Sequence, residues 1–508
     1  MVSPPPPPPG ATGGPPPADS VIGNAGFSLL AQLLTSVFTA GLTLFLARYL
    51  GADRYGIFAL AVSISALVIL PVDFGIAAST GRFLADRRGD LVMVRALLAD
   101  ALALKLVLSI PACLVLAALA GPIASAFDTP GLVWPLRGVA IAVLGQSVLL
   151  LYQGTFAAMG LLRLQFRVQA VESAVETGAS VVFVVLGAGA GGAAFGRGAG
   201  YLVGAVFAVA VTTRVLGRDV LPRRLGGGER MRMISAYAWP LFLVNGAFTL
   251  FEQIDILLIG AIESAGSAGL FQAPLRLATF LHYPGLAVAN AVAPRMVGDD
   301  PATARRRLQA ALRGLILLDT AFVPPLLVWA EPITRLTLGR EYAGSAPVLR
   351  TLTPFVFLLG LAPLVSLAVS YVGQARRRVP VAIATVAINA AIDAVLIPRM
   401  GIIGAAVGTD VAFAVYVAAH VLICRREFGI DLRPLGLTSV RAGLAGAAMA
   451  GVLVLAGIRD LTAREWIVGG TAGLAAYAAV LAVTREVGAD DIRAVRASLR
   501  RRRSGAAP

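Results

Sequence analysis

The chain has 508 residues, of which 57% are hydrophobic and only 14% are charged, and its mean hydropathy is +0.81. A soluble domain has roughly 45 to 50% apolar and about 25% charged residues, so a single soluble core is excluded. Apolar runs of roughly 20 residues, long enough to cross a bilayer, recur along nearly the whole chain, which also excludes one cleaved signal peptide as their explanation. The net charge of +15 lies in short loops between these runs, which indicates membrane orientation and not nucleic-acid binding.

The chain begins with a proline-rich segment, residues 1–20, whose composition predicts a disordered or polyproline tail. Cys113 and Cys424 fall in separate apolar runs, which favours two free structural thiols over a disulfide or a metal pair. After the tail, hydropathy predicts an all-α polytopic membrane protein of about 14 transmembrane helices, at 21–47, 57–80, 93–117, 132–157, 168–188, 198–216, 233–260, 266–294, 314–332, 346–372, 379–398, 401–424, 438–458 and 465–484.

Basic residues are divided unevenly between the two sets of alternate loops. One set, together with the C-terminal tail 486–508, holds 31 of them, and the opposite set holds 8. Because cytoplasmic loops carry the excess of Lys and Arg, both termini are predicted to be cytoplasmic. The remaining four basic residues fall inside predicted spans and are Lys105, Arg137, Arg276 and Arg350.

The chain also repeats itself, because adding 213 to a position in the first half reaches a similar residue in the second half without a gap. A shift of six helices preserves membrane orientation, so 21–230 and 231–430 are predicted to be parallel six-helix repeats, followed by two extra helices in 431–485. Transporters built this way place substrate near the bilayer midplane between the repeats and alternate access by rocking one bundle against the other. The matched pairs include Gly56 and Gly269, Phe58 and Phe271, Pro71 and Pro284, Arg82 and Arg295, Pro111 and Pro324, Gly160 and Gly373, and Gly191 and Gly404.

Arg276 is the first candidate for a binding residue, because it lies about ten residues into its span, near the middle of the bilayer. An ionisable residue there is costly, by roughly 2.5 to 3.5 kcal/mol on insertion scales, and its repeat mate is the neutral Ser63. A guanidinium at this depth can hold a phosphate bidentately; the alternative is a buried ion pair with Asp410.

Arg137 and Arg350 are repeat mates near the outer ends of their spans, where they form either a cationic rim for an anionic headgroup or snorkelling side chains. Lys105 is a weaker candidate of the same kind.

Carboxylates inside the spans form a second group, as binding sites for a coupling proton or sodium ion or as partners of the buried arginines. Glu172 and Glu176 share one helix face at i,i+4, Glu252 and Asp255 are spaced at i,i+3, and Asp410 lies near mid-bilayer, with Asp73, Asp319 and Asp393 as further members. The only lysine does not follow a glycine-rich loop and the two histidines do not form a His-Glu-x-x-His motif. The sequence therefore predicts neither an ATPase, nor a metal site, nor a cofactor.

Three stretches resemble the polysaccharide-export flippases, a branch of the multidrug, oligosaccharidyl-lipid and polysaccharide exporter superfamily. They are LARYLGADRYGIFALAVSISALVILPVDFGIAASTGRFL from Leu46, the segment 254–297 with IDILLIG and GLFQAPLRLATF, and INAAIDAVLIPRMGIIGAAVGTD from Ile388. The resemblance implies a V-shaped pair of six-helix bundles in a bacterial cytoplasmic membrane. It also implies a transport function, the flipping of undecaprenyl-pyrophosphate-linked oligosaccharides, with polymerases, ligases and glycosyltransferases as partners. Arg276 falls in the stretch that matches the cationic cavity, whereas the first helix lacks the charges that some relatives carry.

Two other classes of function stay open. A drug or metabolite cation antiporter of the same superfamily would share the repeats, but it has no need of the two extra helices and would favour an acidic, aromatic-lined cavity. A membrane enzyme acting on the same lipid needs a sizeable outer loop, and the longest predicted outer connection, 331–345, has about 15 residues. The sequence therefore favours a transporter over an enzyme, and a flippase over an antiporter.

Overall fold

The structure is a computed structural model, which describes residues 21–222, 228–279, 282–296, 300–371 and 377–488. The proline-rich tail 1–20 and residues 489–508 of the basic tail lie outside this part. The α-helices are α1 (Val21–Asp73), α2 (Ile76–Asp86), α3 (Leu91–Ala118), α4 (Ala120–Ala126), α5 (Val133–Met159), α6 (Leu162–Phe183), α7 (Gly189–Leu216), α8 (Gly228–Ile262), α9 (Ala265–Ala278), α10 (His282–Val292), α11 (Pro301–Val328), α12 (Ala330–Thr337), α13 (Ser345–Thr351), α14 (Thr353–Tyr371), α15 (Arg378–Met400), α16 (Ile402–Phe428), α17 (Leu432–Ala456) and α18 (Ala463–Val483). Short 3₁₀ or π turns join some of them, including η2 (Val184–Ala188) and η5 (Ala293–Met296).

Ten segments of the described chain are long and apolar enough to cross a membrane, which confirms an all-helical multi-pass architecture. Two of them each hold two predicted spans, because Leu30–Asp73 bends at Gly51 and Leu162–Leu216 bends at Gly187. Both glycines have positive φ, 73° and 93°, a conformation that side chains with a Cβ avoid. The ten segments thus cover twelve predicted spans; the other two correspond to α8 and to the pair α9 and α10, and the total of 14 stays a prediction.

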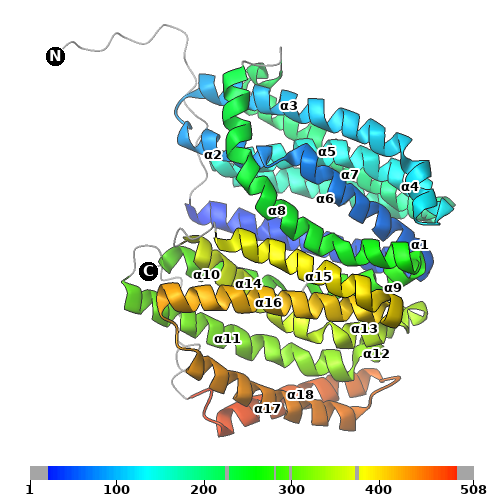
Figure 1. Cartoon of the computed structure of the whole chain (residues 1–508), viewed down its shortest axis with the longest axis vertical. Helices are drawn as coiled ribbons and strands as arrows, with labels where there is room; N and C mark the ends of the chain where they lie inside the picture. The colour runs from blue at the N-terminus through cyan, green and yellow to red at the C-terminus, as the bar shows by residue number, and fades with distance from the viewer. Residues whose placement is uncertain (1–20, 223–227, 280–281, 297–299, 372–376, 489–508) are drawn as a thin grey trace. The chain divides into compact units, whose positions relative to one another are not determined.

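The chain forms two compact units, Met1–Gly269 and Leu270–Pro508. In the first unit α7 packs against both α5 and α6, and α1 also packs against α6 (Figure 1). The close approach of α6 and α7 depends on glycines at every fourth position of α7, namely Gly196, Gly200 and Gly204. A Cβ at Gly200 would lie 2.7 Å from the Cα of Glu176, so only glycine fits there. Small residues that let helix backbones approach are typical of helix packing in membranes.

In the second unit α11 packs against α14 and α17, α10 packs against α14, and α15 pairs with α16. The last two helices, α17 and α18, lie side by side (Figure 1). Trp329, which follows α11, contacts Trp466 of α18 edge to face at 4.9 Å between ring centroids. The Tyr477 hydroxyl donates a 2.7 Å hydrogen bond to the Leu317 carbonyl of α11. Aromatic side chains with a satisfied polar end therefore fix this helical hairpin to α11.

Helix boundaries in the second unit follow those of the first at the offset found in the sequence. The helix α7 begins at Gly189 and α16 at Ile402, 213 positions later. The bounds of α3 and of α5 recur within three residues as those of α11 and of the pair α13 and α14. These recurring boundaries are consistent with the predicted repeat.

Candidate functional site

Lys105 is enclosed in the first unit and forms an ion pair with Asp73. The Lys105 side chain on α3 is 0% exposed, and that of Asp73 at the end of α1 is 23% exposed. The second Asp73 oxygen accepts a 3.1 Å hydrogen bond from the Gly75 backbone N–H. The chain turns sharply here, because Phe74 and Gly75 have positive φ, 45° and 73°. In this structure Lys105 therefore ties α3 to the break between α1 and α2.

Glu172 and Glu176 come together on α6, as their spacing predicts. The Ser173 hydroxyl donates to Glu172 at 3.0 Å. Arg197 of α7 donates to Glu176 at 2.6 Å and to the Tyr201 hydroxyl at 3.1 Å. The Arg197 guanidinium therefore lies against Glu176, one helical turn from Glu172 on the same face of α6.

Glu252 and Asp255, the other predicted carboxylate pair, differ in exposure. Glu252 is exposed on α8, whereas Asp255, three residues later, is buried. Both side chains make contacts of their own. Only Asp255 of this pair therefore has the burial expected of an ion-binding carboxylate within a span.

Arg276 lies near the end of α9 and faces an amide. With the Gln272 side-chain oxygen turned toward it, the Arg276 Nε and Nη2 lie 3.0 and 3.2 Å from that oxygen. Asp410 of α16 accepts a 2.9 Å hydrogen bond from the Phe355 backbone N–H. Among the described residues no carboxylate pairs with Arg276, so the alternative ion pair with Asp410 is absent from this structure. The guanidinium therefore lies beside a neutral amide and not beside a described carboxylate.

Arg137 and Arg350 are exposed near the ends of their helices. The Arg137 guanidinium lies over the Trp134 ring at 4.8 Å from its centroid, a cation–π contact. The Arg350 Nε donates a 3.1 Å hydrogen bond to the Leu327 carbonyl. Both guanidinium groups are oriented by a contact on their own unit and remain accessible.

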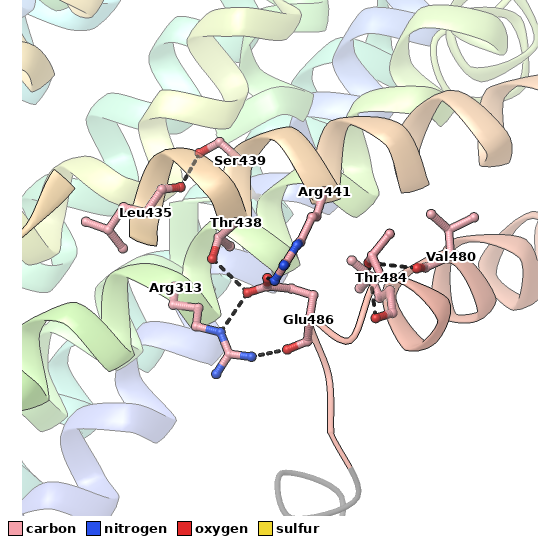
Figure 2. A network of polar contacts seen from close by, with 9 residues as sticks. Arg313, Leu435, Thr438, Ser439, Arg441, Val480, Thr484 and Glu486 are labelled. Atoms are coloured by element: carbon pink, nitrogen blue, oxygen red, sulfur yellow. Dashed lines mark hydrogen bonds and ion pairs between the residues drawn. The ribbon is translucent and has the colours of Figure 1, made fainter. Parts of the chain in front are cut away.

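Sequence reasoning missed an ionic cluster around Glu486, a buried carboxylate just after α18. Figure 2 shows Glu486 between Arg313 of α11 and Arg441 of α17, which both donate to it at 2.8 Å, as does Thr438 at 2.7 Å. Burial alone would raise the pKa of Glu486, but the hydrogen bonds from Arg441, Thr438 and Arg313 outweigh it, so the pKa lies below its usual value. An acidic residue at the start of a strongly basic tail was the signal that could have revealed this cluster.

Comparison with known proteins agrees with the sequence resemblance. Residues 45–347 match the family model described as polysaccharide biosynthesis protein. A Haloferax volcanii protein named as a probable low-salt glycan biosynthesis flippase, Agl15, is 21% identical over 452 residues, which cover 85% of this chain and 91% of that protein.

Solved structures of membrane transporters share the fold. A structure of the lipid II flippase MurJ in an inward closed conformation has a TM-score of 0.76 at 13% identity and covers 90% of this chain and 98% of its own. The eukaryotic MATE transporter AtDTX14 has a TM-score of 0.58 at 15% identity, with coverages of 84% and 100%. The matched family segment spans more than half of the 508 residues. The chain therefore belongs to the polysaccharide biosynthesis protein family of membrane proteins.

Proposed function

We propose that this protein flips undecaprenyl-(pyro)phosphate-linked oligosaccharides from the cytoplasmic to the outer leaflet of a bacterial cytoplasmic membrane during polysaccharide biosynthesis. The observation that carries the proposal is the family match over residues 45–347. It is supported by a relative named as a glycan flippase along 91% of its length and by a fold shared with a lipid II flippase. Polymerases, ligases and glycosyltransferases acting on the same lipid are the partners this function implies.

The proposed transport cycle is alternating access between two six-helix repeats. The recurrence of helix bounds 213 positions apart supports the repeats, and repeats of this kind rock around a central site. Fourteen spans with both termini in the cytoplasm agree with the distribution of arginines between alternate loops.

Arg276 is the proposed contact for the lipid phosphate. Its planar guanidinium can donate two parallel hydrogen bonds to phosphate oxygens, and Gln272 holds it in position. No described carboxylate neutralises it, so an anionic headgroup gains the full charge interaction. Arg137 and Arg350 are proposed to attract the headgroup at the outer rim, and Lys105 to act through its ion pair with Asp73.

The coupling ion is proposed to bind at buried carboxylates. Glu172 and Asp255 are buried, and Glu176 lies one helical turn from Glu172 on the same face of α6. Asp410 and Glu252 complete the set of candidates.

The test is flipping of fluorescent undecaprenyl-pyrophosphate oligosaccharide in proteoliposomes, scored by access of an impermeant sugar-modifying reagent. Arg276→Ala should slow flipping by about tenfold or more, because hydrogen bonds to charged groups contribute about 1.5 to 3 kcal/mol. The flipping rate of Arg276→Lys should fall between those of the wild type and Arg276→Ala, since lysine keeps the charge without the bidentate geometry. Arg399→Ala, which removes an exposed arginine from the end of α15, is the matched control.

Two results would change the proposal. Equal rates for the wild type and Arg276→Ala would remove the central headgroup contact while leaving the flippase function in place. A wild type that moves small organic cations but no lipid-linked sugar would instead favour the cation antiporter.

A further inference from the structure

Asp319 is a buried carboxylate in the second unit that takes no part in the hydrogen-bonded clusters described above. Its side chain, on α11, is 4% exposed. The Oδ2 atom has no hydrogen-bond donor among the described residues. An ionised carboxylate enclosed without a partner has a large desolvation cost, and in proteins such a group neutralises instead.

The packing around Asp319 is built to accept a carboxyl group. Its carboxyl lies against Gly360 of α14, and a Cβ at position 360 would overlap all three carboxyl atoms. The other side of Gly360 meets the backbone of α10 at Gly285, where a Cβ would also collide. Two glycines at one crossing thus bring α10, α11 and α14 together around the Asp319 side chain.

None of the charged or titratable groups described on the elements packed against α11 donates a hydrogen bond to the Asp319 Oδ2 atom, and Arg425 and Arg426 lie in the last turn of α16. From α10, the His282 Nδ1 lies 3.0 Å from the Leu359 carbonyl; α14 carries no charged residue, and Tyr371 stands at its far end. From α16, Asp410 binds the Phe355 N–H, and the His420 Nδ1 lies 2.8 Å from the Tyr416 carbonyl.

The charged residues of the other helices that pack against α11 either have partners of their own or lie away from Asp319. Arg441 of α17 binds Glu486, Arg350 of α13 binds the Leu327 carbonyl, and Glu331 and Arg335 of α12 pair with each other. Arg433 lies in the first turn of α17, at the far end of the helix crossing, and the Arg295 side chain of η5 lies outside the described part. No described cation is therefore within hydrogen-bond reach to hold Asp319 in its ionised form.

We propose that Asp319 is a proton-binding site of the second unit, occupied while α11 packs on α14 at Gly360 and emptied when that contact opens. The proton comes from water and converts the carboxylate to a neutral carboxyl, so the step needs no other reactant. Release of the proton requires water to reach the carboxylate, which links its protonation to the packing of α11 against α14. Proton binding stands independently of the proposed flippase function, whereas the use of that proton to drive transport rests on it.

The binding step is tested by infrared spectroscopy on the full-length protein in liposomes at neutral pH. The wild type should show the carbonyl band of a protonated carboxyl group, and Asp319→Asn should lose part of that band. Asp300→Asn is the matched control, because Asp300 is the exposed N-cap of the same helix and Asn caps equally well. An unchanged band in Asp319→Asn would overturn the proposal.

A second pair of variants tests the geometry without relying on Asp319→Asn. Gly360→Ala should lower the thermal unfolding midpoint, because its Cβ overlaps the Asp319 carboxyl, and it should also shift the carboxyl band. Adding Asp319→Ala removes the overlapping atoms and should restore the midpoint. Failure of the double variant to recover would show that the Asp319 carboxyl is not what opposes the Cβ, and would overturn the assigned contact.

The coupling step is tested by flipping in proteoliposomes with and without a pH gradient. The pH gradient should change the flipping rate of the wild type by about fivefold or more. The flipping rate of Asp319→Asn should not depend on the gradient. The same gradient response in Asp319→Asn would overturn the coupling. If neither protein flips any lipid-linked sugar, the proposed function fails while the infrared result still decides proton binding.

Discussion

Three ionisable side chains inside the predicted spans have different surroundings. Lys105 forms an ion pair with the Asp73 carboxylate, and Arg276 lies beside the Gln272 amide. The Asp319 carboxyl group packs against Gly360. An ion pair stabilises two charges together, and an amide orients a charge without neutralising it. A buried carboxyl group without a hydrogen-bond donor favours its neutral form. These differences at single residues separate structural charges from charges available for a ligand.

The pair of Lys105 and Asp73 should respond asymmetrically to substitution. Asp73→Asn leaves the fully buried Lys105 ammonium alone and should lower the free energy of unfolding by about 3 to 5 kcal/mol. Lys105→Met should cost less, because Asp73 is partly exposed and keeps the hydrogen bond from Gly75. Thermal unfolding of the purified protein in detergent measures both effects.

The double variant with Lys105→Met and Asp73→Asn provides the control. It leaves no buried charge and keeps the hydrogen bond to Gly75, so it should be more stable than Asp73→Asn alone. If the stability loss of the double variant equals the sum of the losses of the two single variants, the two side chains do not interact in the way the structure indicates.

Among the elements, α6 and α7 are the pair whose packing most directly serves a candidate site. Glycines on α7 let the α6 backbone approach, and Gly200 and Gly204 lie against Glu176 and Glu172. The two glutamates therefore sit in a helix contact and not on a lipid-facing surface. Arg197 can reach Glu176 because the helices are this close.

Two glycine substitutions in this helix pair should have opposite effects. Gly200→Ala should destabilise the protein, because its Cβ would lie within 3 Å of the α6 backbone and force the helices apart. Gly178→Ala, on α6, meets open space and should be neutral or stabilise the helix by up to about 1 kcal/mol. Thermal unfolding distinguishes the two variants, and the rate at which a carboxyl reagent modifies Glu176 reports whether its contact with Arg197 is kept. Equal unfolding midpoints would contradict the packing.

Helix positions along the chain were largely predictable, whereas the breaks within helices were not. Apolar runs located the helices because crossing a bilayer requires about 20 apolar residues. The sharp turn at Phe74 was hidden, since a phenylalanine with positive φ is held by tertiary packing, here against Trp239 and Phe242. The division of the predicted span 266–294 into α9 and α10 was likewise not visible in its hydropathy.

The sites were predicted in part, for a related reason. Spacing at i,i+4 correctly brought Glu172 and Glu176 together, because helix geometry alone determines it. Partners from other helices could not be predicted: the Arg276 environment depends on how Gln272 turns, and the Glu486 cluster joins residues 173 positions apart. Contacts between distant segments need the fold, and one sequence contains no record of them.

For the whole molecule, the distribution of arginines predicts which helix ends face the cytoplasm. The chain has only two cysteines, Cys113 and the buried Cys424. The substitutions Cys113→Ser and Cys424→Ala therefore give a cysteine-free variant. In that background, Arg306→Cys near the start of α11 should react with an impermeant thiol reagent from the cytoplasmic side, and Arg459→Cys after α17 from the outer side. Labelling of both from one side would contradict the predicted topology.

The cluster around Glu486 also has a consequence for biogenesis. Arg313 and Arg441 leave the ribosome well before Glu486, the carboxylate to which both donate hydrogen bonds. The second unit can therefore complete this contact only when translation has passed α18. A truncation before Glu486 would remove the carboxylate that links α11 to α17, so this contact between the two helices forms only in a chain that has been translated past α18.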